Sequence, residues 1–175
     1  MEGWKFWWGI AAFFLGGLAT QLSGWITYRR QRADKQADAH DALRQRREDF
    51  ELQHLIETNQ KLHVYRERFW EFIAANRRER LATPEHAARL HSELNVASDA
   101  LREAEGALHG NVGFILDDNI RTQVREAMQN IDAAAGEALY EGEDIPSPVV
   151  TRSLGVAFDA LSERVRVIYA GRPSR

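Results

Sequence analysis

One uncharged segment near the N-terminus constrains this chain more than any other part of its sequence. Residues 6–28 contain no charged side chain over 23 positions, and a cluster of arginines follows directly. A helix of this length extends about 34 Å at ~1.5 Å per residue, enough to cross a hydrocarbon core of about 30 Å. The segment therefore predicts a transmembrane helix, and we assign residues 1–28 to a membrane anchor.

The alternative for this segment is a cleaved secretory signal, with Lys5 as its charged start and residues 17–19 as a small-residue cleavage site. Apolar sequence continues to Ile26, beyond the roughly 7–15 residues typical of a signal core. Aromatic side chains at both ends also favour the uncleaved anchor, because indole and phenol rings suit the boundary between lipid and headgroups. The expected interfacial anchors are Trp4, Trp7, Trp8, Trp25 and Tyr28.

Basic residues beside the segment predict its orientation. Arg29, Arg30, Arg32 and Lys35 follow the uncharged run, whereas Lys5 is the one basic side chain before it. Because basic flanks are retained on the cytoplasmic side, we expect the N-terminus outside and the remaining chain in the cytoplasm. The four basic residues are also expected to contact anionic lipid. The sequence thus predicts a single-pass protein of the cytoplasmic (inner) membrane, and the absence of cysteine fits that compartment.

Small residues form a strip along the uncharged segment. Ala12, Gly16, Thr20 and Gly24 recur every four positions. Such strips let helix backbones approach closely, which predicts a homo-oligomer or a contact with a partner's membrane helix. The alternative is a helix without a specific partner, since small residues are common in membrane helices.

The charges of the chain are unevenly distributed. Residues 29–80 contain 13 basic and 10 acidic side chains, whereas residues 81–175 contain 9 and 15. Of the 23 basic residues 20 are arginine, which suggests coding bias in a GC-rich bacterial or phage genome. Arginine clusters occur at residues 29–32, 44–47 and 77–80, but none alternates with aromatic residues as a base-stacking surface would. Nucleic-acid binding is therefore not expected.

Beyond the anchor, every segment predicts helix. Residues 29–49 are charged and alanine-rich, without proline or glycine, and predict a solvated helical stalk that continues the membrane helix. A self-associating stalk is the alternative. From Phe50 to about Arg80, apolar residues recur at helical spacing. The expected inward-facing residues of this helix are Leu52, Leu55, Ile56, Leu62, Tyr65, Phe69, Phe72 and Ile73.

The second bundle helix is expected to start with Thr83 as its cap and Pro84 as its first residue. An apolar seam with alternating spacings of three and four follows, and residues 109–113 are expected to end the helix. The seam consists of Ala87, Leu90, Leu94, Ala97, Leu101, Ala104 and Leu108.

Two further helices complete the pattern. Asp117 or Asp118 is expected to start the third helix, which stops at Gly142, and Ser147-Pro148 starts the fourth, which ends at residues 171–173. The expected inward faces are Ile120, Val124, Ala127, Ile131, Ala134 and Ala138 in the third helix, and Val150, Leu154, Ala157, Leu161, Val165 and Ile168 in the fourth.

These segments predict an all-α protein. A single N-terminal transmembrane helix continues into a helical stalk and an up-and-down antiparallel four-helix bundle, since short connections make neighbouring helices antiparallel. We assign residues 29–49 to the stalk, 50–172 to the cytoplasmic four-helix bundle and 173–175 to a tail.

A metal site is the one form of chemistry that the pattern suggests. Glu51 and His54 lie one helical turn apart, as in carboxylate-bridged di-iron bundles. Those sites require a second Glu-x-x-His motif, and the nearest pair here, Glu105 and His109, is spaced four apart. The chain also lacks cysteine, a G-x-S-x-G motif and a glycine-rich phosphate loop. We expect no catalytic, cofactor, metal or small-molecule site, with a metal-binding bundle as the remaining alternative.

The leading functional hypothesis is a membrane-anchored, non-catalytic interaction or scaffold protein whose cytoplasmic bundle binds a protein partner. In outline, with one N-terminal span followed by a helical domain, the chain resembles the inner-membrane spanins of phages. This resemblance covers organisation only and implies a role as a lysis accessory. The charge pattern departs from it by placing the helices in the cytoplasm rather than the periplasm. A phage- or prophage-type effector of superinfection exclusion is the form of this alternative that the charge pattern allows.

Overall fold

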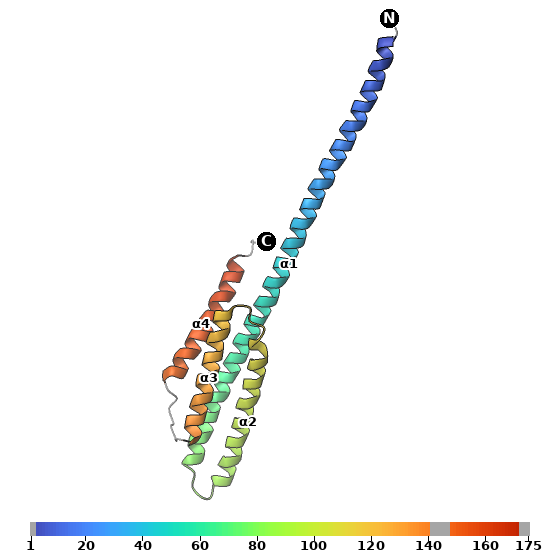
Figure 1. Cartoon of the computed structure of the whole chain (residues 1–175). Coiled ribbons are helices and arrows are strands. Elements are labelled where there is room, and N and C mark those ends of the chain that lie inside the picture. The colour runs from blue at the N-terminus through green and yellow to red at the C-terminus, as the bar shows by residue number, and fades with distance from the viewer. Residues whose placement is uncertain (1–2, 141–147, 172–175) are drawn as a thin grey trace. The chain divides into compact units, whose positions relative to one another are not determined.

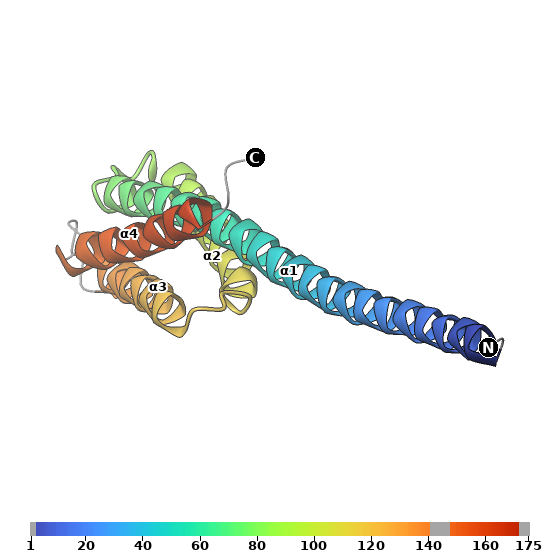
Figure 2. The ribbon, with the colours of Figure 1, turned by 90° about the horizontal axis from the view of Figure 1, so that it is seen from above.

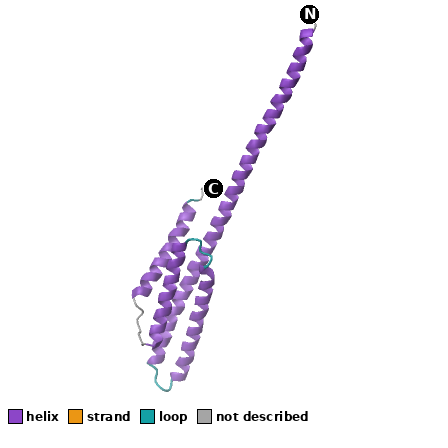
Figure 3. Ribbon diagram, in the orientation of Figure 1, coloured by secondary structure: helices purple, strands orange, loops and turns teal. Residues whose placement is uncertain are grey.

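The chain folds into α-helices throughout the part that the structure describes. The computed structural model describes the backbone of residues 3–140 and 148–171, and the side chains of residues 35, 38–140 and 148–171. The helices are α1 (Gly3–Arg80), α2 (Ala87–Val112), α3 (Asp118–Tyr140) and α4 (Pro148–Ala170). These described ranges contain no strand (Figure 3), which confirms the all-α prediction. The chain divides into two compact units, residues 1–47 and residues 48–175, here called unit 1 and unit 2.

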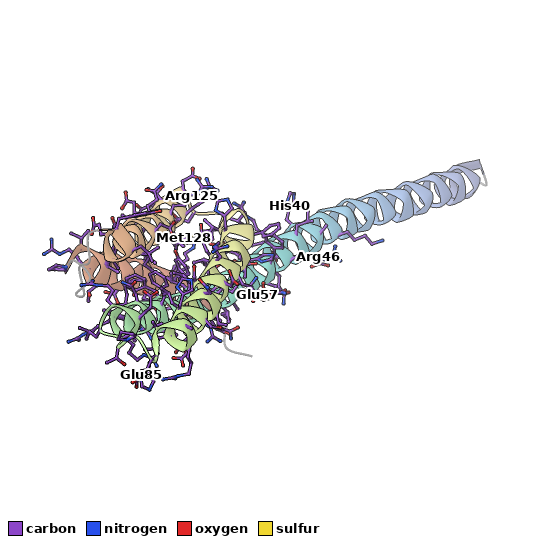
Figure 4. All side chains as sticks on the ribbon, turned by 90° about the horizontal axis from the view of Figure 1, so that it is seen from below. His40, Arg46, Glu57, Glu85, Arg125 and Met128 are labelled. Atoms are coloured by element: carbon purple, nitrogen blue, oxygen red, sulfur yellow. The ribbon has the colours of Figure 1, made fainter. Side chains whose placement is uncertain are left out.

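Unit 1 contains the first part of α1. Its described side chains, at residues 35 and 38–47, are all exposed, and His40 and Arg46 project outward from the helix (Figure 4). The predicted anchor and the start of the stalk fall on side chains outside the described part. Among the described residues, no helix combines the length and the apolar character needed to cross a bilayer.

Unit 2 is a bundle of four helical segments. Residues 48–80 of α1, then α2, α3 and α4 lie side by side, and successive segments run in opposite directions (Figures 1 and 2). Side chains from all four segments form one hydrophobic core. Its largest fully buried members are Tyr65, Phe69 and Phe72 of α1. The aromatic side chains of α1 therefore fill much of the space between the other helices.

The inward face predicted for residues 50–80 is buried except at one position. Seven of its eight residues belong to the buried core, but Ile56 is 38 % exposed. Ile56 lies at the edge of this face, where it lines a hollow with Leu161 and Val165 of α4. The prediction for Ile56 is wrong because helical spacing alone does not show where the partner helix stops covering the apolar stripe.

The predicted start of α2 is also wrong. Residues 84–86 form a turn, closed by the His86 amide donating to the Thr83 carbonyl at 2.9 Å, and the helix begins at Ala87. The Thr83 hydroxyl lies 3.0 Å from Nδ1 of His86 instead of capping the helix amides. The first residue of the predicted seam, Ala87, is accordingly exposed. From Leu94 onward the seam residues are buried, apart from Ala97, which is partly buried against the core.

Helix α2 ends within the range that the sequence predicts. It passes through Gly110 and extends to Val112, with Gly113 in a right-handed conformation at its C-cap. Asn111 and Val112 are both buried in the bundle. The prediction that residues 109–113 end this helix is therefore confirmed.

Helices α3 and α4 begin as predicted. One carboxylate oxygen of Asp117 accepts hydrogen bonds from the amides of Asn119 at 2.9 Å and Ile120 at 3.2 Å, so Asp117 is the N-cap of α3. Helix α4 starts at Pro148. Proline suits the first position of a helix, because an N–H there would have no intrahelical partner. Every predicted inward residue of the two helices is buried, apart from Val165, which is partly buried against the core. The predicted stop at Gly142 lies outside the described residues.

Replacement of the α3 cap tests this local account. The Asp117→Ala substitution is expected to reduce the free energy of unfolding by about 1 kcal/mol, because two first-turn amides lose their acceptor. Asp118→Ala is the matched control, since Asp118 is exposed and pairs only with Arg121 on the surface. Asp118→Ala is expected to reduce the free energy of unfolding by at most about 0.5 kcal/mol. Urea unfolding of the full chain measures both, and an equal loss in the two variants would contradict the assignment of the cap.

Candidate functional site

Most of the predicted site residues belong to the N-terminal segment. Lys35 is the one whose side chain the structure describes, and it is exposed. The others lie outside the described side chains and stay predictions: Ala12, Gly16, Thr20 and Gly24 of the association face, Trp4, Trp7, Trp8, Trp25 and Tyr28 of the interfacial anchors, and Arg29, Arg30 and Arg32 of the basic flank.

Glu51 and His54, the pair considered as metal ligands, contact other side chains. Glu51 is 5 % exposed and accepts hydrogen bonds from Nε of Arg164 at 2.6 Å and from its Nη2 at 3.1 Å. The ring of His54 packs edge-on against Phe50 and stacks on Phe114, with centroid distances of 4.3 and 4.8 Å. Within residues 38–140 and 148–171, no group of three or more metal-ligating side chains is present. Both residues thus have a packing role that accounts for their positions.

A polar network connects α1 to the end of α2. Nζ of Lys61 donates to the side-chain oxygen of Asn111 at 2.9 Å, and the amide nitrogen of Asn111 donates to Glu57 at 3.3 Å. Gln53 donates to the other oxygen of Glu57 at 3.0 Å. These hydrogen bonds from Gln53 and Asn111 lower the pKa of the Glu57 carboxyl below its ordinary value. The network explains why Asn111 is helical and buried despite its polar side chain.

Tyr65 connects α1 to α3 inside the bundle. Its ring is fully buried, and its hydroxyl donates to a carboxylate oxygen of Asp132 at 2.5 Å. Burial, and then the hydrogen bond and charge of Asp132, raise the pKa of Tyr65 far above its ordinary value. Burial and the charge of Asp132 also raise the pKa of Glu105 on α2. Tyr65 therefore stays protonated and acts as a permanent hydrogen-bond donor.

These contacts link α1 to each of the other helices of unit 2. Glu51 pairs with α4, Lys61 bonds to α2, and Tyr65 bonds to α3. The buried side chain of Asn76 donates to the carbonyl of Ala138, in the last turn of α3, at 2.8 Å. The polar side chains thus set the register of the bundle.

The arginine clusters beyond residue 32 have different surroundings. Residues 44–47 are exposed, whereas Arg78 donates to the carbonyl of Ala74 at 3.2 Å and pairs with Glu93 of α2 at 3.4 Å. Helix α1 ends at Arg80, so the cluster at residues 77–80 occupies the last turn as predicted. Cations are favourable there because they meet the negative end of the helix dipole.

An open hollow of about 680 Å³ lies between α1 and α4, here called the α1/α4 groove. It is lined by Arg66, Glu67, Trp70 and Glu71 of α1 and by Thr151, Leu154, Gly155 and Phe158 of α4. Trp70 is 44 % exposed, whereas Leu154 is buried at the base. A Cβ atom added to Gly155 would have no heavy atom within 4 Å. The groove therefore combines an exposed indole with an unfilled position on the facing helix.

The groove is apolar at its base and polar at its rim. The ring of Phe158 stacks on His63 with a centroid distance of 4.2 Å, and the guanidinium of Arg66 lies 5.5 Å from the centre of the same ring. Glu71 pairs with Arg68 at 2.6 Å, so its charge is already matched. This surface resembles a protein contact more than a reactive site, because aromatic and arginine side chains are enriched at protein interfaces.

Two smaller hollows flank α4. One of about 240 Å³ is lined by Asn59 and Leu161 among others, and one of about 530 Å³ is lined by Gln123 and Glu163 among others. The side-chain oxygens of Asn59 and Gln123 are buried and have no hydrogen-bond partner among the described residues. Neither hollow contains an aromatic side chain, so the α1/α4 groove is the stronger candidate for an interaction surface.

The sequence prediction missed this groove. Trp70 falls outside the apolar stripe of its helix, and Gly155 lies inside a helix where glycine is unfavourable by about 1 kcal/mol relative to alanine. Both departures were visible in the sequence. What the sequence could not supply is the register between α1 and α4, which brings the two positions to the same hollow.

No protein family, curated protein or solved structure matches this chain.

Substitutions in the Glu51 and Arg164 pair test the asymmetry of its burial. The side chain of Glu51 is 7 % exposed and that of Arg164 is 37 % exposed. Arg164→Met is expected to cost about 2–4 kcal/mol because it leaves a buried carboxylate unpaired, whereas Glu51→Met is expected to cost about 1 kcal/mol. The free energy of unfolding of the double variant should fall by less than the sum of the two single reductions. Urea unfolding measures all three, and strict additivity would show that the pair does not interact.

The raised pKa of Tyr65 predicts a dependence of stability on pH. The unfolded tyrosine ionises near pH 10, whereas the folded protein retains the proton. Its contribution is therefore complete below pH 10, and the free energy of unfolding falls by about 1.4 kcal/mol per pH unit above it. Tyr65→Phe should remove this part of the slope. The slope is measured from urea unfolding between pH 9 and 11 as a difference between the two proteins, and identical slopes would contradict the account.

Proposed function

We propose that this protein is a single-pass, membrane-anchored helical interaction protein whose cytoplasmic bundle binds a protein partner without catalysing a reaction. The observation on which the proposal chiefly rests is the contrast within unit 2. Its buried charged and polar side chains mostly bond between helices, whereas the α1/α4 groove leaves Trp70 exposed to solvent. A bundle built in this way has a surface suited to binding and no reactive group positioned beside it.

The anchor is supported by the sequence together with the backbone of α1. The uncharged residues 6–28 lie within the range Gly3–Arg80, over which the backbone is helical. A helix satisfies its own amide and carbonyl groups, which is the condition for a segment to lie in lipid. Ala12, Gly16, Thr20 and Gly24 would then provide the face through which the membrane helix forms a homo-oligomer or contacts a partner's span.

The charge distribution supports the proposed orientation. Residues 29–47 contain 7 basic and 3 acidic side chains, whereas unit 2 contains 15 and 22, a net charge of −7. A basic segment directly after the span is retained in the cytoplasm and attracted to anionic headgroups. An acidic bundle is repelled by the same surface. The bundle would therefore face the cytoplasm and remain available to a partner.

Charged substitutions within the uncharged run test the anchor. The double substitution Leu15→Arg/Leu18→Arg is expected to release the full chain from membranes that are washed with alkaline carbonate, since each arginine near the bilayer centre costs about 2.5–3.5 kcal/mol. Ala39→Arg/Ala42→Arg is the matched control, because it adds the same charge to the exposed stalk, and it should remain in the membrane fraction. Quantitative blotting of the two fractions measures the result.

Two outcomes would contradict this proposal. The first is an unsubstituted chain that carbonate already extracts, since a single-pass protein resists that treatment. The second is a C-terminal epitope that an external protease digests in intact cells, because it would place the bundle outside.

A further inference from the structure

We propose that the α1/α4 groove binds a second copy of this chain, related to the first by a twofold axis. The contact surface would comprise Trp70 and Glu67 of α1 and Gly155 of α4, and it adds an interface in the bundle to the one proposed in the membrane helix. This inference rests on the proposed function in one respect, which is that anchored copies have the same orientation.

The first observation for a second copy is the shape of the groove. Trp70 is a large side chain with 44 % of its surface exposed, and Gly155 leaves an open position on the facing helix. In a twofold contact, residue i of one copy meets residue j of the other, and j meets i. One surface must then present both a projecting group and a space to receive it. Trp70 of each copy can occupy the space at Gly155 of the other.

The second observation is the charge of the rim. After Glu71 has paired with Arg68, the rim retains one positive group, Arg66, and one negative group, Glu67. A rim with one charge of each sign complements itself across a twofold axis. A lipid surface or a nucleic acid would require an excess of basic groups, which the groove lacks. The balance therefore favours a second copy over a polyanionic ligand.

The position of the groove along the bundle and the tethering of each copy to the membrane also favour a second copy. Residues 66–71 of α1 and 151–158 of α4 line one groove, so both halves of the contact lie at the same level of the bundle. Copies anchored in one membrane are parallel, which brings equal levels together. Tethering also raises the effective concentration of one bundle around another. A groove of modest size is then sufficient for association.

The natural absence of cysteine allows a direct test by crosslinking. Thr151→Cys in the full chain places a thiol at an exposed position of the groove that leaves Gly155 unchanged, and Gly106→Cys is the matched control because Gly106 is exposed on α2 outside the groove. Treatment of native membranes with a short bismaleimide should give a homodimer from Thr151→Cys and little or none from Gly106→Cys. Mass spectrometry of the product identifies the joined chains.

A second substitution tests the role of the indole. Trp70→Ala in the Thr151→Cys chain should weaken association by about 30-fold, the typical effect of removing an interface tryptophan. Val96→Ala is its control, since Val96 is an exposed apolar residue of α2 outside the groove, and it should leave the homodimer unchanged.

The outcomes separate this inference from the proposed function. Equal homodimer from both cysteine positions, or a Thr151→Cys product joined to a different protein, overturns the second-copy contact. Failure of the anchor is detected independently, as loss of the same chains from the membrane fraction.

Discussion

The bundle depends on the residues of α1 between Glu48 and Arg80. These residues supply its largest fully buried side chains, and they bond to each of the other helices through Glu51, Lys61 and Tyr65. Apolar packing alone tolerates a shift of one helix along another, whereas a buried hydrogen bond does not, since a shift leaves a donor or acceptor unpaired. The polar contacts of α1 therefore set the position of α2, α3 and α4.

The same contacts pair most of the charged and polar side chains buried inside unit 2. The carboxylate of Glu51 is held by Arg164, the hydroxyl of Tyr65 is held by Asp132, and Glu57 accepts hydrogen bonds from two amides. The α1/α4 groove differs because its aromatic surface meets solvent instead of another helix.

Much of the fold followed from local patterns in the sequence. The Asp117 cap, the Pro148 start and the inward stripes of α3 and α4 depend on spacing and end chemistry, which a single sequence displays. The start of α2 at Ala87 did not follow, because a turn at residues 84–86 replaces the first helical turn that Thr83 and Pro84 would begin. The groove depends on the pairing of α1 with α4, 113 residues apart at Glu51 and Arg164, and no local pattern specifies that pairing.

The central claim is that residues 48–80 of α1 form the structural core of the bundle. Hydrogen exchange of backbone amides in the full chain, resolved by mass spectrometry, tests it most directly. Residues 55–76 should exchange slowest, and roughly 100-fold or more slower than residues 38–47, whose side chains are exposed. Similar rates in the two segments, or slower exchange in α4 than in residues 55–76, would contradict the claim.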